Sequence, residues 1–113
     1  MGLKTTNYVS KSTELVLPEA YAAIRKISVD LGIGSALLAI QTSRERALDK
    51  SYKAVDEVHI NFTWDRKTDP AKMAYEAAKT QAVWETEYNK DGSVKARKIK
   101  EYGVLYGWDN DFV

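Results

Sequence analysis

The sequence contains no cysteine, a single histidine and two prolines in 113 residues. The absence of cysteine excludes a disulfide framework, thiolate metal ligands and a thiol nucleophile. No apolar run approaches the roughly 20 residues that span a bilayer, and the first residues lack the apolar core of a signal peptide. Seventeen basic and sixteen acidic residues give a net charge of +1. We therefore expect cytoplasmic synthesis, no membrane contact, and no attraction to nucleic acid through net charge.

The length corresponds to one domain with a modest core. The clearest strand signal lies in residues 55–64, where apolar side chains occupy every second position: Val58, Ile60, Phe62 and Trp64. Polar residues fill most of the alternate positions. This period of two predicts a strand with one buried face.

A helix is predicted to begin directly after this strand. Asp69 can accept hydrogen bonds from the first amides of a helix, and Pro70 suits the first helical position because it has no N–H. Small or apolar residues then recur with helical spacing, together with one glutamine: Met73, Ala74, Ala77, Ala78 and Gln81. This narrow stripe predicts a helix from Pro70 to about Trp84 that lies flat on a sheet.

The first half of the chain is ambiguous. Residues 18–31 fit a helical stripe, but their alternate residues also fit a strand, and periodicity alone favours the helix. Residues 35–42 form a short apolar run that suits either class, and the charged residues 44–53 indicate a connection. Apolar residues within 9–17 suggest an edge strand that Pro18 ends.

The C-terminal third carries a hairpin signal and a group of aromatic residues. Asp91-Gly92, between segments that can pair, predicts a tight turn in a β-hairpin. So many aromatic side chains either return to the core or contact another chain. The candidate contact residues are Tyr102, Tyr106, Trp108 and Phe112, with Arg97 and Lys100 as salt-bridge partners.

Residues suited to catalysis or metal binding are sparse. His59 is the only histidine, and a single histidine on the polar face of a strand is usually structural or solvated. Asp109-Asn110-Asp111 lacks the glycine and distal glutamate of an EF-hand loop. Glu85 and Glu87 lie in charged surroundings that would not separate two carboxylate pKa values. We predict no catalytic residue, no metal site and no cofactor.

Four segments carry a family resemblance, in the order 14–24, 37–46, 58–62 and 73–79. Two short motifs stand out within them: Ala20-Tyr21 followed by Ile24, and Ala74-Tyr75 followed by Lys79. The series resembles a group of small structural proteins of tailed bacteriophages, usually encoded among the tail and baseplate genes. The chain departs from that pattern at Ala78, where leucine is usual, and in the longer segment after Thr80. The resemblance implies that residues 21–29 form a strand, against the periodicity.

These observations predict a single α+β domain with a small, mostly antiparallel sheet, one helix packed on it, and a C-terminal hairpin or extended arm. Residues 1–84 form the predicted core. Residues 85–113 belong to the same domain or dock on a neighbour.

The resemblance implies a non-catalytic structural component of a virion, in the tail or baseplate. Its expected partners are copies of itself and other virion proteins in a symmetric assembly. A small nucleic-acid-binding protein that uses the basic residues 95–100 is an alternative, although nearby acidic residues offset that charge. A small inhibitor of a host enzyme is another.

Overall fold

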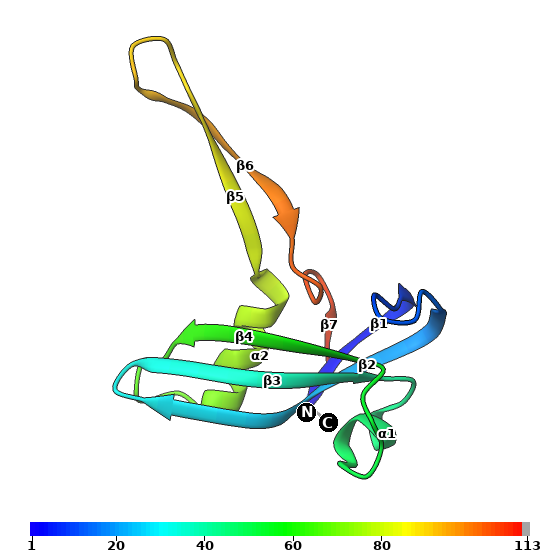
Figure 1. Ribbon diagram of the computed structural model, residues 1–113. Helices are drawn as coiled ribbons and strands as arrows, with labels where there is room; N and C mark the ends of the chain where they lie inside the picture. The colour runs from blue at the N-terminus through cyan, green and yellow to red at the C-terminus, as the bar shows by residue number, and fades with distance from the viewer. Residues whose placement is uncertain (112–113) are drawn as a thin grey trace.

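The structure, a computed structural model, describes residues 1–111 (Figure 1). Phe112, one of the predicted contact residues, lies outside the described residues. Within residues 1–111 the chain forms seven strands and two helices: β1 (Gly2–Val9), β2 (Val16–Asp30), β3 (Ile33–Gln41), α1 (Arg44–Leu48), β4 (Asp56–Thr63), α2 (Pro70–Thr80), β5 (Ala82–Tyr88), β6 (Val94–Tyr102) and β7 (Asp109–Asp111).

Five strands form an antiparallel sheet in the order β4-β3-β2-β1-β7. Strands β5 and β6 form a separate antiparallel hairpin that projects from this body, as Figure 1 shows. The α+β class and the mostly antiparallel sheet agree with the sequence-based prediction. The prediction of a single helix was wrong, because the charged connection after β3 contains the short helix α1.

Strand β2 covers the segment whose periodicity favoured a helix. Its neighbours β1 and β3 lie on both sides, and both faces of its central part are buried, so its apolar residues do not alternate with polar ones. The expected end of a strand at Pro18 was also wrong, since β2 continues through it. Pro18 fits there because it lies opposite Asn7, where the ladder between β1 and β2 lacks a pair and Asn7 has a φ of 54°.

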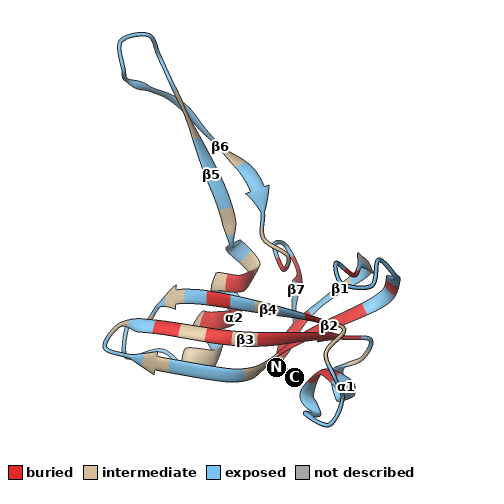
Figure 2. Ribbon diagram, viewed as in Figure 1, coloured by how far each residue is buried: buried red, intermediate tan, exposed pale blue. Residues whose placement is uncertain are grey.

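Helix α2 packs against one face of the five-stranded sheet, where the core lies (Figure 2). Its buried residues are Ala74, Tyr75 and Ala78, and the two alanines let the helix approach the strands closely. The Tyr75 hydroxyl accepts from the Ile24 amide at 2.9 Å and donates to the Met1 carbonyl at 3.1 Å. The predicted start is confirmed, because the Asp69 side chain accepts from the Ala71 amide and Pro70 follows it.

Helix α2 ends at Thr80 rather than near Trp84. Gln81 already has extended geometry, with a φ of −65° and a ψ of 124°, and β5 begins at the next residue. Beyond this point Ala82, Trp84 and Thr86 alternate with Val83, Glu85 and Glu87 along the strand. β-Branched and aromatic residues prefer strands, and pairing with β6 makes this segment a strand instead of a continuation of α2.

The opposite face of the sheet carries α1, which Arg25 holds in place. Arg25 lies at a register shift between β2 and β3, and its guanidinium donates to the carbonyls of residues 46, 47, 49 and 52 at 2.6–3.2 Å. Backbone carbonyls at the end of a helix have no partner within the helix, so one cation satisfies several of them together. Ala47 of α1 packs against Tyr21 and Ala23 beneath it.

A buried carboxylate joins the loop after β1 to the start of β4. Asp56 accepts from the Tyr8 hydroxyl at 2.6 Å and from the amides of Lys11 and Ser12 at 3.1 Å each. Burial alone would raise the pKa of Asp56, but the hydrogen bonds from Ser12, Tyr8 and Lys11 outweigh it and lower that pKa. The charged form of Asp56 therefore stabilises the fold.

The Asp56→Asn variant should be less stable by about 1–3 kcal/mol at pH 7, because an amide group would face hydrogen-bond donors. A lowered folded pKa gives stability that is present above the unfolded pKa, about 3.9, and is lost as pH falls through the folded value. The difference in the free energy of unfolding between wild type and Asp56→Asn should therefore decrease as the pH falls from 5 to about 3. Urea unfolding at several pH values in this range measures the difference, and a difference that does not change with pH would contradict this account.

Candidate assembly surface on the projecting hairpin

The hairpin is closed by the turn that the sequence indicated. Gly92 has a φ of 88°, a conformation that favours glycine, and the Asp91 carboxylate accepts from the Ser93 amide at 2.9 Å. The Asn89 amide donates to the Ser93 carbonyl at 2.8 Å. The pairing of β5 with β6 extends from this turn down to Ala82 and Tyr102.

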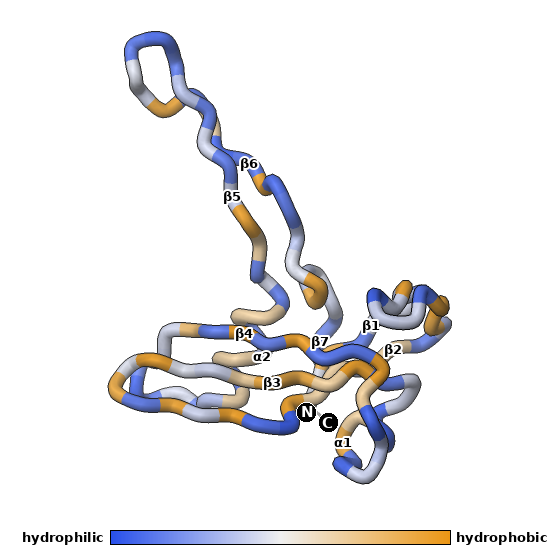
Figure 3. Tube along the Cα trace, viewed as in Figure 1, coloured by the Kyte–Doolittle hydropathy of each residue, from blue (hydrophilic) through white to orange (hydrophobic). Residues whose placement is uncertain are grey.

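The two faces of the hairpin differ in chemistry. Cross-strand partners share a face, so the register of β5 with β6 assigns each side chain. The face that we call the aromatic face carries Ala82, Trp84, Thr86 and Tyr88 from β5 and Val94, Arg97, Ile99 and Tyr102 from β6. The charged face carries Val83, Glu85, Glu87, Ala96, Lys98 and Glu101. Figure 3 shows the resulting mixture of hydrophilic and hydrophobic residues along both strands.

The aromatic face is exposed to solvent. Trp84 is 51% exposed, Tyr88 65% and Tyr102 59%, although each has a large apolar ring. The Arg97 guanidinium lies 5.4 Å from the centre of the Trp84 ring, within the range of a cation–π contact. On the charged face, Lys98 and Glu87 form an ion pair at 2.7 Å. One face therefore leaves large aromatic rings half or more exposed within residues 1–111, whereas the other is suited to water.

The base of the hairpin is attached to the end of α2. The Gly103 amide donates to the Gln81 carbonyl at 2.8 Å, and the Gly107 amide donates to the Lys79 carbonyl at 3.0 Å. A Cβ atom at Gly103 would lie 2.7 Å from the Gln81 carbonyl oxygen, closer than side chains approach backbone. Beyond this junction the chain returns to the body and ends the described region as β7, paired with β1.

The predicted contact residues separate into two groups. Trp108 is only 5% exposed and belongs to the core, with its ring centre 5.4 Å from that of Tyr8. Tyr106 is 39% exposed, and its ring packs against that of Tyr102 at 4.6 Å near the base of the hairpin. Tyr102, Arg97 and Lys100 are exposed on the hairpin. Trp108 thus completes the core of its own chain.

Sequence reasoning missed the main residues of the aromatic face in β5. Trp84 was placed at the end of the helix, and Tyr88 served only as part of a hairpin signal. The alternation of Ala82, Trp84, Thr86 and Tyr88 against Val83, Glu85 and Glu87 could have revealed them.

Other candidate groups lie apart from one another. His59 is exposed on the polar side of β4, Glu85 and Glu87 are on the charged face of the hairpin, and Asp109 and Asp111 lie in β7. Among residues 1–111, no group of three or more His, Asp or Glu side chains could hold a metal ion.

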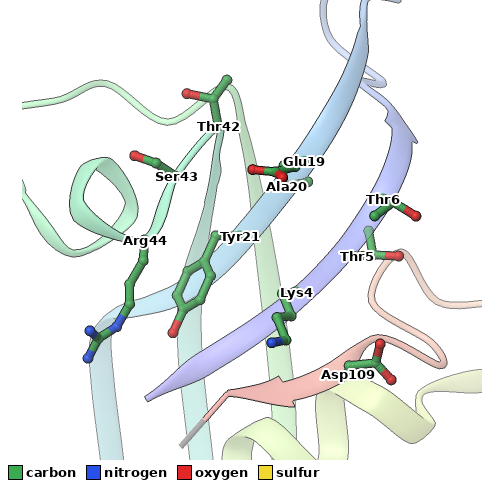
Figure 4. A pocket seen from close by; sticks show the side chains of 10 residues that line it. All are labelled: Lys4, Thr5, Thr6, Glu19, Ala20, Tyr21, Thr42, Ser43, Arg44 and Asp109. Atoms are coloured by element: carbon green, nitrogen blue, oxygen red, sulfur yellow. The ribbon is translucent and has the colours of Figure 1, made fainter. Parts of the chain in front are cut away.

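A polar pocket of about 440 Å³ lies on the sheet beside α1, lined by β1, β2, the residues 42–44 and Asp109 (Figure 4). The Tyr21 ring lies in it next to Arg44. Burial, with a further contribution from the Asp111 carboxylate, raises the pKa of Tyr21 to about 12, so its hydroxyl keeps its proton at neutral pH. Lys4 and Arg44 stand against Glu19 and Asp109 around the pocket, so it selects neither anions nor cations.

No helix within the described residues is long and apolar enough to cross a membrane. Comparisons of the chain with protein-family models, curated proteins and solved structures give no match.

Two tryptophans distinguish core from contact surface. Trp108→Ala should lower the free energy of unfolding by about 3–5 kcal/mol, because it empties a buried site. Trp84→Ala should cost less than about 1 kcal/mol, because its ring is half exposed and loses only the contact with Arg97. Urea unfolding of the two variants tests this, and equal losses would assign Trp84 to the core.

Gly103→Ala tests how the hairpin is attached. The added methyl group should force the Gln81 carbonyl to move and cost about 1–3 kcal/mol. The Gly103 amide should also lose its protection from hydrogen exchange. Gly92→Asn is the control, because asparagine tolerates a positive φ in a turn and nothing lies near an added Cβ there. Unchanged protection of Gly103 in the alanine variant would contradict the account.

Proposed function

We propose that the protein is a non-catalytic structural component of a bacteriophage virion, in the tail or baseplate, that assembles through the β5–β6 hairpin. The attribution to phage is supported by the sequence resemblance over the segments 14–24 to 73–79. The assembly role is supported by one structural observation, the exposed aromatic face of a hairpin that leaves the body. The two parts rest on independent evidence.

The shape of the molecule supports a contact role for the hairpin. The radius of gyration is 16.1 Å, against about 13 Å for a compact domain of this length. An isolated two-stranded hairpin is at most marginally stable in water, so projection of β5 and β6 contributes little to folding. A projecting element of this kind gains stability when a neighbouring chain covers it.

The composition of the aromatic face suits a protein partner. Trp, Tyr and Arg are the residues most enriched among those that dominate binding energy at interfaces, and Trp84, Tyr88 and Arg97 all lie on this face. Aromatic side chains bury about 150–250 Å² each, so a few of them form the centre of an interface.

A nucleic-acid partner fits this surface less well. The aromatic face carries one cation, Arg97, which lies over the Trp84 ring. On the charged face, Lys98 is engaged by Glu87, and Glu85 and Glu101 lie beside it. Phosphate binding depends on unopposed positive charge, which this mixture does not supply.

The proposed function is tested in virions produced by the host that carries the gene. Mass spectrometry of purified particles should detect the full chain in a copy number comparable to other structural proteins. Complementation with Trp84→Glu should give particles that lack the chain or fail to form. Val83→Glu is the matched control, because Val83 is 54% exposed against 51% for Trp84 but lies on the charged face. Absence of the wild-type chain from virions, or equal effects of both variants, would contradict the proposal.

A further inference from the structure

The two strands of the hairpin have different outer edges. Within residues 1–111 the sheet has only these two strands, so each has one edge that pairs with nothing described. The register shows two extra residues, both in β6: Lys100 lies between the partners of Val83 and Trp84, and Lys95 between those of Glu87 and Tyr88. Bulges and edge lysines are devices that prevent further strand pairing.

The edge of β5 has no such protection. Its seven residues, Ala82–Tyr88, contain no lysine, glycine or proline, and no extra residue interrupts them. The charged residues of β5 are Glu85 and Glu87, which lie on the charged face. An uninterrupted edge of this length presents unpaired backbone N–H and C=O groups to any strand that can lie beside it. Of the two edges, β5 is therefore the one built to accept a further strand.

The hydrogen-bond pattern shows which residues face that edge. The Gly103 amide bonds to the Gln81 carbonyl, and the Asn89 amide bonds to the Ser93 carbonyl. Backbone groups alternate between the two edges along an antiparallel strand, so the odd-numbered residues of β5 point toward β6. The backbone groups of Trp84, Thr86 and Tyr88 consequently point to the open edge, and these residues carry the aromatic face.

The geometry of an antiparallel pair makes this edge complementary to a second copy of itself. In an antiparallel pair, residues whose backbone groups face each other also place their side chains on the same side. A second β5 strand, antiparallel to the first, would therefore align its aromatic residues with those of the first on one common face.

We propose that β5 pairs antiparallel with β5 of a second copy of this chain around a twofold axis, forming a four-stranded sheet in the order β6-β5-β5-β6. This inference rests on the proposed function because it takes the hairpin as the contact element. It adds that the partner of the hairpin is a second copy of the chain. A twofold contact uses the same surface on both copies, as this edge allows. The net charge of +1 leaves little repulsion between two copies.

The carboxylates of β5 select the register. Registers centred on Glu85, Thr86 or Glu87 place carboxylates of the two copies directly opposite one another, which is unfavourable in a sheet. Registers centred on Ala82, Val83 or Tyr88 align three residues of the strand or fewer. The register centred on Trp84 sets Ala82 opposite Thr86 and Val83 opposite Glu85, and it brings the two Trp84 rings together.

A proline at the open edge tests the pairing. Thr86→Pro removes an outward N–H while leaving the bonds between β5 and β6 in place. Thr86→Val is the matched control, because it keeps the N–H. Sedimentation of the full-length chain should show a dimer for wild type and for Thr86→Val at micromolar concentration, and at least tenfold weaker association for Thr86→Pro. Equal association of the two variants, or a monomeric wild-type chain at 100 µM, overturns the proposal.

Disulfide trapping tests the register independently of that proline. The chain has no native cysteine, so introduced thiols have no competitors. Opposed residues lie about 5.5 Å apart between Cα atoms in the relevant type of pair, within the range of a disulfide. The double variant Ala82→Cys/Thr86→Cys should form a covalent dimer on mild oxidation, whereas Ala82→Cys/Tyr88→Cys should cross-link at least tenfold more slowly. Equal rates overturn the register.

The two proposals fail in different ways. If Trp84→Glu removes the chain from virions while Thr86→Pro associates like Thr86→Val, the assembly role stands and the β5 pairing is wrong. If the dimer forms and depends on the Thr86 amide but the chain is absent from virions, the pairing stands and the virion role is wrong.

Discussion

The base of the hairpin is closed by a tight backbone contact at the end of α2, the hydrogen bond from the Gly103 amide to the Gln81 carbonyl. At this point β6 passes so near to the end of α2 that a side chain has no room. The bond from Gly107 to Lys79 repeats the contact a few residues later. Because both strands of the hairpin are fixed at their base to a helix packed on the sheet, the aromatic face takes its orientation from the core.

The same junction divides the aromatic residues between two environments. Leu105 and Trp108 follow it directly and are buried, so the return of the chain to the body anchors the hairpin with apolar contacts as well as hydrogen bonds. Trp84 and Tyr88 lie in β5 of the projecting hairpin and are exposed. Trp84 and Trp108 have the same side chain, but only Trp108 is buried, because it follows Gly103, where the chain returns to the body.

The sequence predicted the elements whose signals are local and complete. The alternation in β4, the cap formed by Asp69 and Pro70, and the Asp91-Gly92 turn each contain their own physical cause, and each lies where it was predicted. For strand β2 the periodicity favoured a helix, because a central strand buried on both faces loses its period of two. Strand β1 was not predicted, since its exposed and buried residues carry little apolar contrast.

The aromatic face of the hairpin was harder to predict from the sequence for a related reason. The alanine stripe of α2 leads without interruption into Ala82, and only pairing with β6 ends the helix at Thr80. Such pairing is a long-range interaction that a window of local sequence does not contain. The distinction between Trp108 and Trp84 likewise depends on where the chain turns back, so composition alone grouped every C-terminal aromatic residue as one contact set.

An anchored hairpin with an open edge has a thermodynamic consequence for binding. A flexible segment loses conformational entropy when it docks, and this loss is subtracted from the affinity that its contacts provide. Fixing both strands at the base sets the orientation of β5 before any partner binds, and the extra lysines at 95 and 100 in β6 leave β5 as the edge open to pairing. Because the same residues carry the outward backbone groups and the aromatic rings, a strand that pairs with this edge places its own side chains beside those rings. The hairpin therefore combines strand pairing, which is tolerant of sequence, with an aromatic face that restricts which strand can bind.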